Sequence, residues 1–268
     1  MAVVVRGCRG KRDEVTIATN HDNHDYHDLP HNESSKMPEI IINGSEGRIE
    51  GRYHPSEQKG APVALVLHPH PLYGGTMNNK IVYRLYHIFA QNGFSVLRFN
   101  FRGVGKSQGK YDNGIGELTD AATVLDWLQQ QNLDTPTCWI AGFSFGAWIA
   151  LQLLMRRPEI EGFAAISPPA NLYDFSFLSP CPAAGIITQG DKDDVVSEEA
   201  VAKLVERLSA LHGSRVEYQR IPGADHYYRG VEDDLSTIVN DYIVGRMADF
   251  TQKRKIRPDR KRRQLPRD

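Results

Sequence analysis

Cysteine is scarce in this chain of 268 residues. The three cysteines, Cys8, Cys138 and Cys181, are odd in number and form no C-x-x-C pair, which argues against a disulfide framework and against a thiolate zinc site. A reducing compartment is the simplest interpretation. The apolar opening at residues 1–5 is also too short for the core of a secretory signal, so we expect a cytoplasmic protein.

Long apolar runs and a surplus of one charge are missing as well. No apolar stretch approaches the roughly 18 residues of a membrane-spanning helix. The formal net charge of -1 gives no overall attraction to nucleic acid or to an anionic membrane, since such attraction follows summed charge or a local patch. The sequence therefore predicts neither a nucleic-acid partner nor a membrane partner.

Both ends of the chain have the composition of unstructured segments. Residues 1–37 show no apolar period and contain a His/Asp-rich stretch, which predicts a disordered arm. Met37 precedes the first strand-like run, so translation starting there is one hypothesis. From Lys253 onward nine Lys or Arg stand against two Asp, a block that repels itself. We expect a folded domain over 38–248 and a basic disordered tail over 249–268.

Between the ends, short β-rich runs alternate with longer helical runs, a pattern typical of βα units on a mainly parallel sheet. The first two strands, 39–42 and 48–53, are expected to form a hairpin around Asn43-Gly44, a turn-favouring pair. Six nearly apolar strands, as in a sheet covered on both faces, are predicted at 63–67, 95–99, 137–141, 163–166, 185–188 and 216–221. Helices are predicted at 79–91, 116–130, 147–156, 198–212 and 232–247.

Two segments match Gly-x-Ser-x-Gly, one centred on Ser144 and the other on Ser107. This motif exposes a serine hydroxyl on a sharp turn between a strand and a helix, with glycines where a β-carbon would collide. Ser144 follows a predicted strand and precedes a predicted helix, whereas glycines and polar residues follow Ser107. The context therefore predicts Ser144 as a nucleophile.

A serine nucleophile needs an imidazole base and a carboxylate that orients the imidazole. In the fold that carries this motif the chain order is Ser, acid, His. His212 and His226 follow the candidate acids. His212 closes a predicted helix, where a side chain is more often a helix cap than a catalytic base. We therefore predict His226 as the base. The acid should follow the strand at 185–188, where spacing alone does not separate its three candidates, Asp191, Asp193 and Asp194.

Together these residues resemble the α/β-hydrolase superfamily, and within it the small cap-less serine hydrolases, predicted esterases similar to serine aminopeptidase and dipeptidyl-peptidase domains. The resemblance covers about 38–248. Its further motifs are His68-Pro-His70-Pro, Gly74-Gly-Thr-Met-Asn-Asn79, the loop at 100–109, Gly-x-x-Asp-x-Val-Val and Gly-Ala-Asp-His. It implies a mostly parallel eight-stranded sheet flanked by helices with no large cap domain, and it implies Asp193, the fourth position of Gly-x-x-Asp, as the acid.

The resemblance also implies that a backbone N–H of a His-Gly-x loop lies in the oxyanion hole. This sequence departs from that form because Pro69 and Pro71 have no N–H. His70 is then the donor in this loop, and we expect the backbone N–H groups of His70 and Phe145 to hold the oxyanion.

The expected function is that of a serine hydrolase with an acyl-enzyme mechanism, most simply a carboxylesterase. About 18 residues separate the strands that end at Ile166 and begin at Gly185, too few for a helical lid, so small to medium soluble esters are expected. Leu72, Tyr73 and Tyr173 are expected to line the substrate pocket. A thioesterase or a short-peptide amidase would use the same triad. We expect a small-molecule acyl substrate, no cofactor and no metal, and a homo-oligomer is compatible with the sequence.

Three other interpretations were weighed. Residues 100–107 nearly match a P-loop, but Asn100 replaces the first glycine and no helix follows at once, as phosphate binding requires. A non-catalytic binding protein on the same fold is the alternative from another class. A metal site formed by His21, His24, His27 and His31 would stand in the predicted arm, without the supporting shell that metal sites use.

Overall fold

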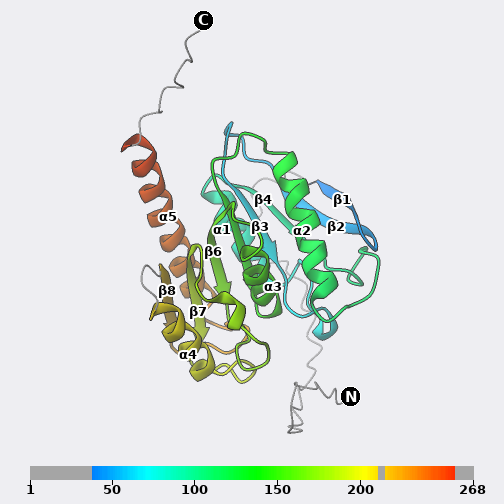
Figure 1. The fold of residues 1–268 in the computed structure, drawn as a ribbon. Helices are drawn as coiled ribbons and strands as arrows, with labels where there is room; N and C mark the ends of the chain where they lie inside the picture. The colour runs from blue at the N-terminus through cyan, green and yellow to red at the C-terminus, as the bar shows by residue number, and fades with distance from the viewer. Residues whose placement is uncertain (1–37, 211–214, 257–268) are drawn as a thin grey trace, which may run out of the picture. The chain divides into compact units, whose positions relative to one another are not determined.

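The computed structural model describes residues 38–210 and 215–256. Eight strands in this part of the chain form one sheet in the order β1-β2-β4-β3-β5-β6-β7-β8 (Figure 1). The strands are β1 (Glu39–Gly44), β2 (Gly47–His54), β3 (Val63–Leu67), β4 (Ser95–Phe99), β5 (Cys138–Phe143), β6 (Ile160–Ile166), β7 (Ala184–Gly190) and β8 (Val216–Ile221). β1 and β2 form an antiparallel hairpin, β2 pairs antiparallel with β4, and all other pairs are parallel.

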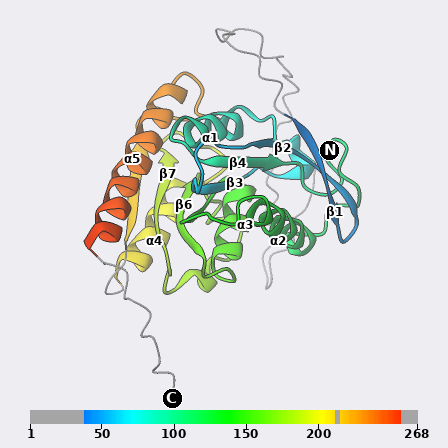
Figure 2. The ribbon, with the colours of Figure 1, turned by 90° about the horizontal axis from the view of Figure 1, so that it is seen from above.

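Helices cover both faces of this sheet. They are α1 (Lys80–Gln91), α2 (Ile115–Gln130), α3 (Phe145–Leu154), α4 (Glu198–Ser209) and α5 (Glu232–Ile256), with the short 3-10 helices η1 (Pro71–Tyr73) and η2 (Ser176–Leu178). α1 and α5 pack together on one face, and α2, α3 and α4 bury their apolar residues on the other (Figure 2). Because β3 to β7 are buried along nearly their whole length, their continuous apolar runs fit a two-sided core.

The predicted fold class is confirmed: an eight-stranded, mostly parallel sheet with flanking helices. The connection from β6 to β7 contains no regular element except η2, so no cap domain is inserted there. Of the helices that the structure describes, none offers an apolar stretch of the length that a bilayer crossing requires.

The turn of the first hairpin was predicted wrongly. Asn43 and Gly44 continue β1, Gly44 pairs with Gly47, and the turn therefore lies at Ser45 and Glu46. The two strands stay paired up to Gly44 because Ile42 and Ile49, both buried, face each other across them. Gly47 then adopts a positive φ of 110°, a conformation that favours glycine.

The last helix also differs from its prediction. α5 continues to Ile256, so the expected boundary at 248 between domain and tail falls within the helix. Lys and Arg have good helix propensity, and their charge is favourable near a helix C-terminus, so the basic composition did not stop the helix there. The predicted arm at 1–37 and the remainder of the predicted tail, 257–268, lie outside the described residues.

Candidate active site

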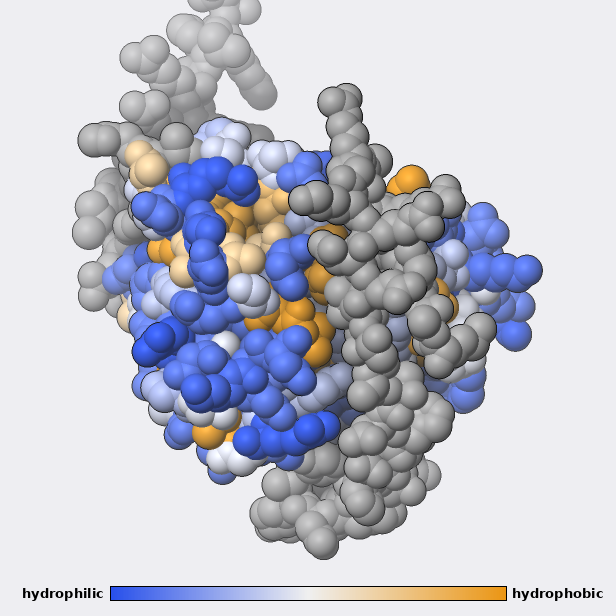
Figure 3. All heavy atoms as spheres, turned by 90° about the horizontal axis from the view of Figure 1, so that it is seen from below, coloured by the Kyte–Doolittle hydropathy of each residue, from blue (hydrophilic) through white to orange (hydrophobic). Residues whose placement is uncertain are grey.

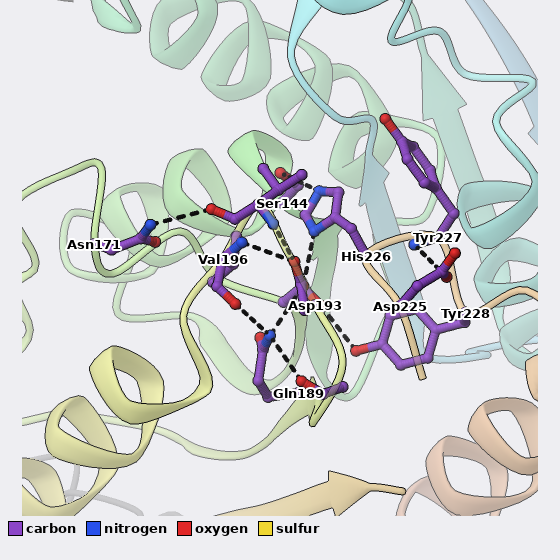
Figure 4. Close-up of polar contacts among 12 residues, drawn as sticks. Ser144, Asn171, Gln189, Asp193, Val196, Asp225, His226, Tyr227 and Tyr228 are labelled. Atoms are coloured by element: carbon purple, nitrogen blue, oxygen red, sulfur yellow. Dashed lines mark hydrogen bonds and ion pairs between the residues drawn. The ribbon is translucent and has the colours of Figure 1, made fainter. Parts of the chain in front are cut away.

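Ser144 lies at a sharp turn between β5 and α3, near the carboxyl edge of the parallel strands (Figure 4). Its backbone has φ 54° and ψ -120°, a conformation that side chains other than glycine seldom adopt. The backbone N–H of Ser144 donates to the Ile166 carbonyl oxygen at 2.8 Å, and the Ser144 carbonyl oxygen accepts from Ala147 N–H. The surrounding strand and helix thus hold a strained residue in place.

The glycines on either side of Ser144 are required by close backbone approach. A β-carbon on Gly142 would lie 2.3 Å from the Gly146 carbonyl oxygen. A β-carbon on Gly146 would lie 2.5 Å from the carbonyl oxygens of Leu67 and His68. These approaches bring the start of α3 directly against the end of β3, and so set the loop after β3 beside Ser144.

Ser144, His226 and Asp193 form a continuous hydrogen-bonded chain. His226 Nε2 lies 3.2 Å from Ser144 Oγ, and His226 Nδ1 lies 2.8 Å from Asp193 Oδ2. Ser144 and His226 are buried, and the Asp193 side chain has no exposed surface. An ionised Asp193 accepts a hydrogen bond from Nδ1–H, which leaves the Nε2 lone pair of a neutral imidazole facing the serine hydroxyl.

Asp193 is fixed by the turn that follows β7. Its Oδ1 accepts hydrogen bonds from the backbone N–H groups of Val195 and Val196, at 2.9 and 2.7 Å. Burial alone would raise the pKa of Asp193, but the hydrogen bonds from His226 and from these two amides lower it below its ordinary value. The carboxyl group is therefore ionised at neutral pH.

The other two candidate acids are not in contact with His226 in this arrangement. Asp191 accepts a hydrogen bond from the Gly223 backbone N–H at 2.7 Å, and Asp194 is exposed. Asp225, next to the imidazole, accepts from the backbone N–H groups of Tyr227 and Arg229 and shapes the loop. Of the three neighbours, Asp193 alone bonds the His226 ring among the described contacts.

Gln189 was missed at the sequence level. This fully buried side chain at the end of β7 donates from Nε2 to Asp193 Oδ2 at 2.9 Å and to the Val196 carbonyl oxygen at 3.0 Å (Figure 4). Asp193 Oδ2 thus receives hydrogen bonds from both Gln189 and His226. A polar side chain inside an otherwise apolar strand was the available signal.

Tyr228 was missed as well, and it anchors the loop that carries His226. Its fully buried hydroxyl lies 2.9 Å from Ser167 Oγ and 3.2 Å from Thr188 Oγ1. Tyr228 and Ser167 both have positive φ, 57° and 44°. The edge of the sheet therefore holds this loop by a buried hydroxyl network, which joins the ends of β6 and β7 to the residue two places after His226.

The histidines after β3 fix the loop on the other side of Ser144. His68 is fully buried, with Nδ1 2.6 Å from the Pro69 carbonyl oxygen and Nε2 accepting from Phe101 N–H at 3.0 Å. Burial lowers the pKa of His68 to about 3, so the ring is neutral. It ties the loop after β3 to the loop after β4, a structural role.

The side chains of His70 and Phe145, the two residues expected to form the oxyanion hole, are in contact. The His70 and Phe145 rings are 4.9 Å apart between centroids, and within the described residues neither backbone N–H has a hydrogen-bond acceptor. The His70 carbonyl oxygen accepts from Tyr73 N–H and Gly75 N–H, so the loop is well defined. The role of these two amides as oxyanion donors stays a prediction.

The expected pocket residues surround this point to different degrees. The Tyr73 ring packs on His70 at 4.6 Å and the Tyr173 ring on Phe145 at 6.0 Å, whereas Leu72 is 63% exposed. Figure 3 views the face that contains the carboxyl edge, where hydrophobic surface is visible near the centre among hydrophilic residues.

The second Gly-x-Ser-x-Gly segment has a structural role. Ser107 Oγ accepts from Glu50 N–H at 2.9 Å and donates to the Asn100 carbonyl oxygen at 2.7 Å. Glu50 Oε2 accepts from Asn100 Nδ2 and Lys106 N–H. The amides that a P-loop would offer to phosphate are partly used within the protein, and a carboxylate lies among them.

The metal-site alternative and the second candidate base, His212, remain to be compared with the structure. Among the described residues no cluster of three or more His, Cys, Asp or Glu could hold a metal ion. His212 and the four arm histidines, His21, His24, His27 and His31, lie outside the described residues.

Relatives share this architecture. A Rickettsia prowazekii protein, RP471, described only as uncharacterized, is 54% identical over 232 residues, 85% of this chain and 98% of its own. The crystal structure of ATU1826 from Agrobacterium tumefaciens is also 54% identical, with TM-score 0.78 over 79% of this chain and 97% of that one. XC6422 from Xanthomonas campestris, an α/β serine hydrolase without a lid, is 32% identical to this chain. Its crystal structure has a TM-score of 0.69 and covers 76% of this chain and 92% of its own.

A family model matches most of the domain. The model for X-Pro dipeptidyl-peptidases of the S15 family aligns with residues 52–220, which include Ser144 and Asp193 and end before the His226 loop. The chain therefore belongs to the S15 family and, with its solved relatives, to the α/β-hydrolase superfamily of serine hydrolases.

Proposed function

We propose that this protein is a serine carboxylesterase that hydrolyses small to medium soluble esters through an acyl-enzyme. The proposal rests above all on one observation, the chain of hydrogen bonds from Ser144 Oγ through His226 to Asp193, at 3.2 and 2.8 Å. These are the distances over which a base activates a serine and an acid orients the base.

In the acylation step, Ser144 Oγ attacks the ester carbonyl carbon while His226 Nε2 takes the hydroxyl proton. Asp193 accepts a hydrogen bond from His226 Nδ1–H throughout and stabilises the imidazolium. The tetrahedral intermediate then collapses, the bond to the alcohol oxygen breaks, and Nε2–H gives its proton to the departing alcohol. The acyl group remains on Ser144.

The negative oxygen of the tetrahedral intermediate is assigned to the backbone N–H groups of His70 and Phe145. Phe145 begins α3, so the positive end of the helix dipole adds to this stabilisation. Removal of one such donor typically raises the barrier by about 3 kcal/mol. In the second half of the reaction a water attacks the acyl-enzyme, with His226 as base, and releases the acid and free Ser144.

The S15 family match favours a second candidate, a short-peptide amidase on the same three residues. Amide hydrolysis uses the same addition and acyl-enzyme, with an amine instead of an alcohol taking the proton from His226. The lid-free connection after β6 leaves room for either substrate, and a thioester would follow the same path.

Turnover by purified protein tests the proposal. Wild type and Ser144→Ala are compared on p-nitrophenyl acetate, butyrate and octanoate, and on an Xaa-Pro p-nitroanilide. The carboxylesterase proposal expects ester turnover by wild type alone, with little anilide cleavage. A preference for the anilide would favour the amidase, and an inactive wild type would favour a non-catalytic binding protein.

A further inference from the structure

Next to Phe145, three polar side chains, His70, Tyr111 and Tyr173, form a short network of neighbouring polar groups. The His70 ring accepts Leu72 N–H at Nδ1, at 3.1 Å, and its Nε2 lies 3.1 Å from the Tyr111 hydroxyl. The Tyr173 hydroxyl is a neighbour of the Tyr111 hydroxyl, and the two hydroxyls influence each other's pKa. These side chains come from three separate loops, after β3, after β4 and after β6.

Not every N–H and O–H proton of this network is donated in a hydrogen bond. Because Nδ1 accepts Leu72 N–H, a neutral His70 carries its proton on Nε2 and donates it to Tyr111. Burial lowers the pKa of His70 to about 4, so the ring is neutral at physiological pH. The Tyr111 hydroxyl receives this hydrogen bond from His70, so its own proton and the proton of the Tyr173 hydroxyl are left.

Neither of these O–H protons has an acceptor among the hydrogen bonds of the described residues. The nearby buried carboxylate of Glu117 accepts instead from the backbone N–H groups of Asp112 and Gly114, at 2.9 and 2.7 Å. Burial raises the pKa of both tyrosines, so both stay protonated. Since both tyrosines are only half-buried, a ligand can approach them.

Among the described ring contacts, the network contacts Phe145, the residue after Ser144, and does not contact His226. Its rings pack on Phe145, with centroid distances of 6.1 Å for Tyr111 and 6.0 Å for Tyr173. The rings that contact His226 are those of Phe143 and Tyr227 instead. In ester hydrolysis the leaving alcohol takes a proton from His226 Nε2, so the alcohol lies on the His226 side and the acyl group extends the other way.

We propose that the Tyr111–Tyr173 hydroxyl pair is an acyl-group subsite, which donates one hydrogen bond to an oxygen acceptor within the acyl chain. The inference rests on the proposed ester hydrolysis and narrows its substrate class to oxygenated acyl groups, such as alkoxy or keto acids. The aromatic surroundings, with Tyr173 stacked on Trp148 at 4.3 Å, contact the carbon atoms of such a chain, and the hydroxyl pair distinguishes it from a plain alkyl chain of the same length.

Matched esters that exchange one CH₂ for O test this subsite. The acyl pairs are p-nitrophenyl methoxyacetate against butyrate and methoxypropanoate against pentanoate, and the alcohol pair is methoxyethyl acetate against butyl acetate. The ratio of kcat/KM within each pair is measured for wild type, Tyr111→Phe and Tyr173→Phe. Dividing each variant's ratio by the wild-type ratio cancels the intrinsic reactivity of the oxygenated ester.

We expect each tyrosine variant to lower the preference for at least one oxygenated acyl group about 5- to 10-fold, the value of one neutral hydrogen bond, and to leave the alcohol pair unchanged. Tyr83→Phe, which removes a hydroxyl on α1 outside this network, should change no ratio. Two variants keep the test informative if one of them folds poorly.

Unchanged acyl ratios in an active Tyr111→Phe enzyme would overturn the subsite and leave the esterase proposal intact. A change confined to the alcohol pair would overturn the assignment to the acyl side. A wild-type protein inactive on every ester would refute the esterase proposal, and the subsite with it.

Discussion

Two five-residue segments of this protein share the pattern Gly-x-Ser-x-Gly, and their serines serve different purposes. Ser107 accepts one hydrogen bond from Glu50 N–H and donates another to the Asn100 carbonyl oxygen, so its hydroxyl is used entirely in holding a loop. Ser144 has its hydroxyl proton directed at one partner only, His226 Nε2. A hydroxyl is available for chemistry where the fold gives it a base and leaves its oxygen otherwise unbonded.

The largest expected difference is in activity. Ser144→Ala should lower kcat by on the order of 10⁴-fold or more, because removal of a serine nucleophile removes the acyl-enzyme. Ser107→Ala should retain activity but lose about 1 to 3 kcal/mol of unfolding free energy, because Glu50 N–H and the Asn100 carbonyl are left without partners. Ester kinetics and urea unfolding of both variants measure this contrast, which would collapse if Ser107→Ala were the inactive one.

Substitution of different glycines by alanine should change the stability of the protein to different degrees. Gly146→Ala places a β-carbon against fixed backbone oxygens and should cost about 3 kcal/mol or more. Gly109→Ala meets side-chain atoms of Glu46 and Arg102 and has φ 89°, so a cost of about 1 to 2 kcal/mol is expected. Gly245→Ala, in α5 with open space, should instead stabilise by about 0.5 to 1 kcal/mol. Equal melting temperatures for the Gly146 and Gly245 variants would contradict this account.

The loops beside the two serines are joined by His68, which should make stability depend on pH. The pKa of His68 falls to about 3 in the folded protein, whereas an unfolded histidine titrates near 6.5. Between these values the unfolded state binds the extra proton, so stability is lost as the pH falls through this window. We therefore expect the unfolding free energy, measured with urea between pH 6 and pH 4, to fall less steeply with decreasing pH in His68→Asn than in wild type. The difference between the two slopes should be about 1.4 kcal/mol per pH unit. Parallel slopes would refute a buried neutral imidazole.

A smaller effect is expected at Gln189. Gln189→Met keeps the volume of the side chain but removes the donor to Asp193 Oδ2, so Asp193 and His226 lose part of their alignment. We expect kcat to fall about 10-fold with KM unchanged, because positioning affects the transition state more than substrate binding. A change in KM alone would show that Gln189 does not act through the triad.

The sequence predicted most of the sheet because buried parallel strands are nearly continuous apolar runs. It predicted the turn of the first hairpin wrongly, because the pairing of Ile42 with Ile49 outweighs the local preference of Asn43-Gly44. It predicted the end of α5 too early, because clustered Lys and Arg are compatible with a helix as well as with a tail.

For the site, Ser144 and His226 were predicted from motif and chain order and Asp193 from the resemblance, and the structure places the three proposed triad residues within hydrogen-bond reach. Gln189 and Tyr228 were missed, because their roles depend on which strands are neighbours. Tyr111 was missed because the polar loop around it has no periodicity and its hydrogen-bond partner, His70, is distant in the chain.

The most direct test of the central claim is to find which serine reacts. Wild-type protein is labelled with a fluorophosphonate and digested with trypsin, which separates Ser107, in the peptide 107–110, from Ser144, in the peptide 111–156. The account predicts one label, on Ser144, and none in Ser144→Ala. A label on the peptide 107–110, or an unlabelled wild-type protein, would contradict it.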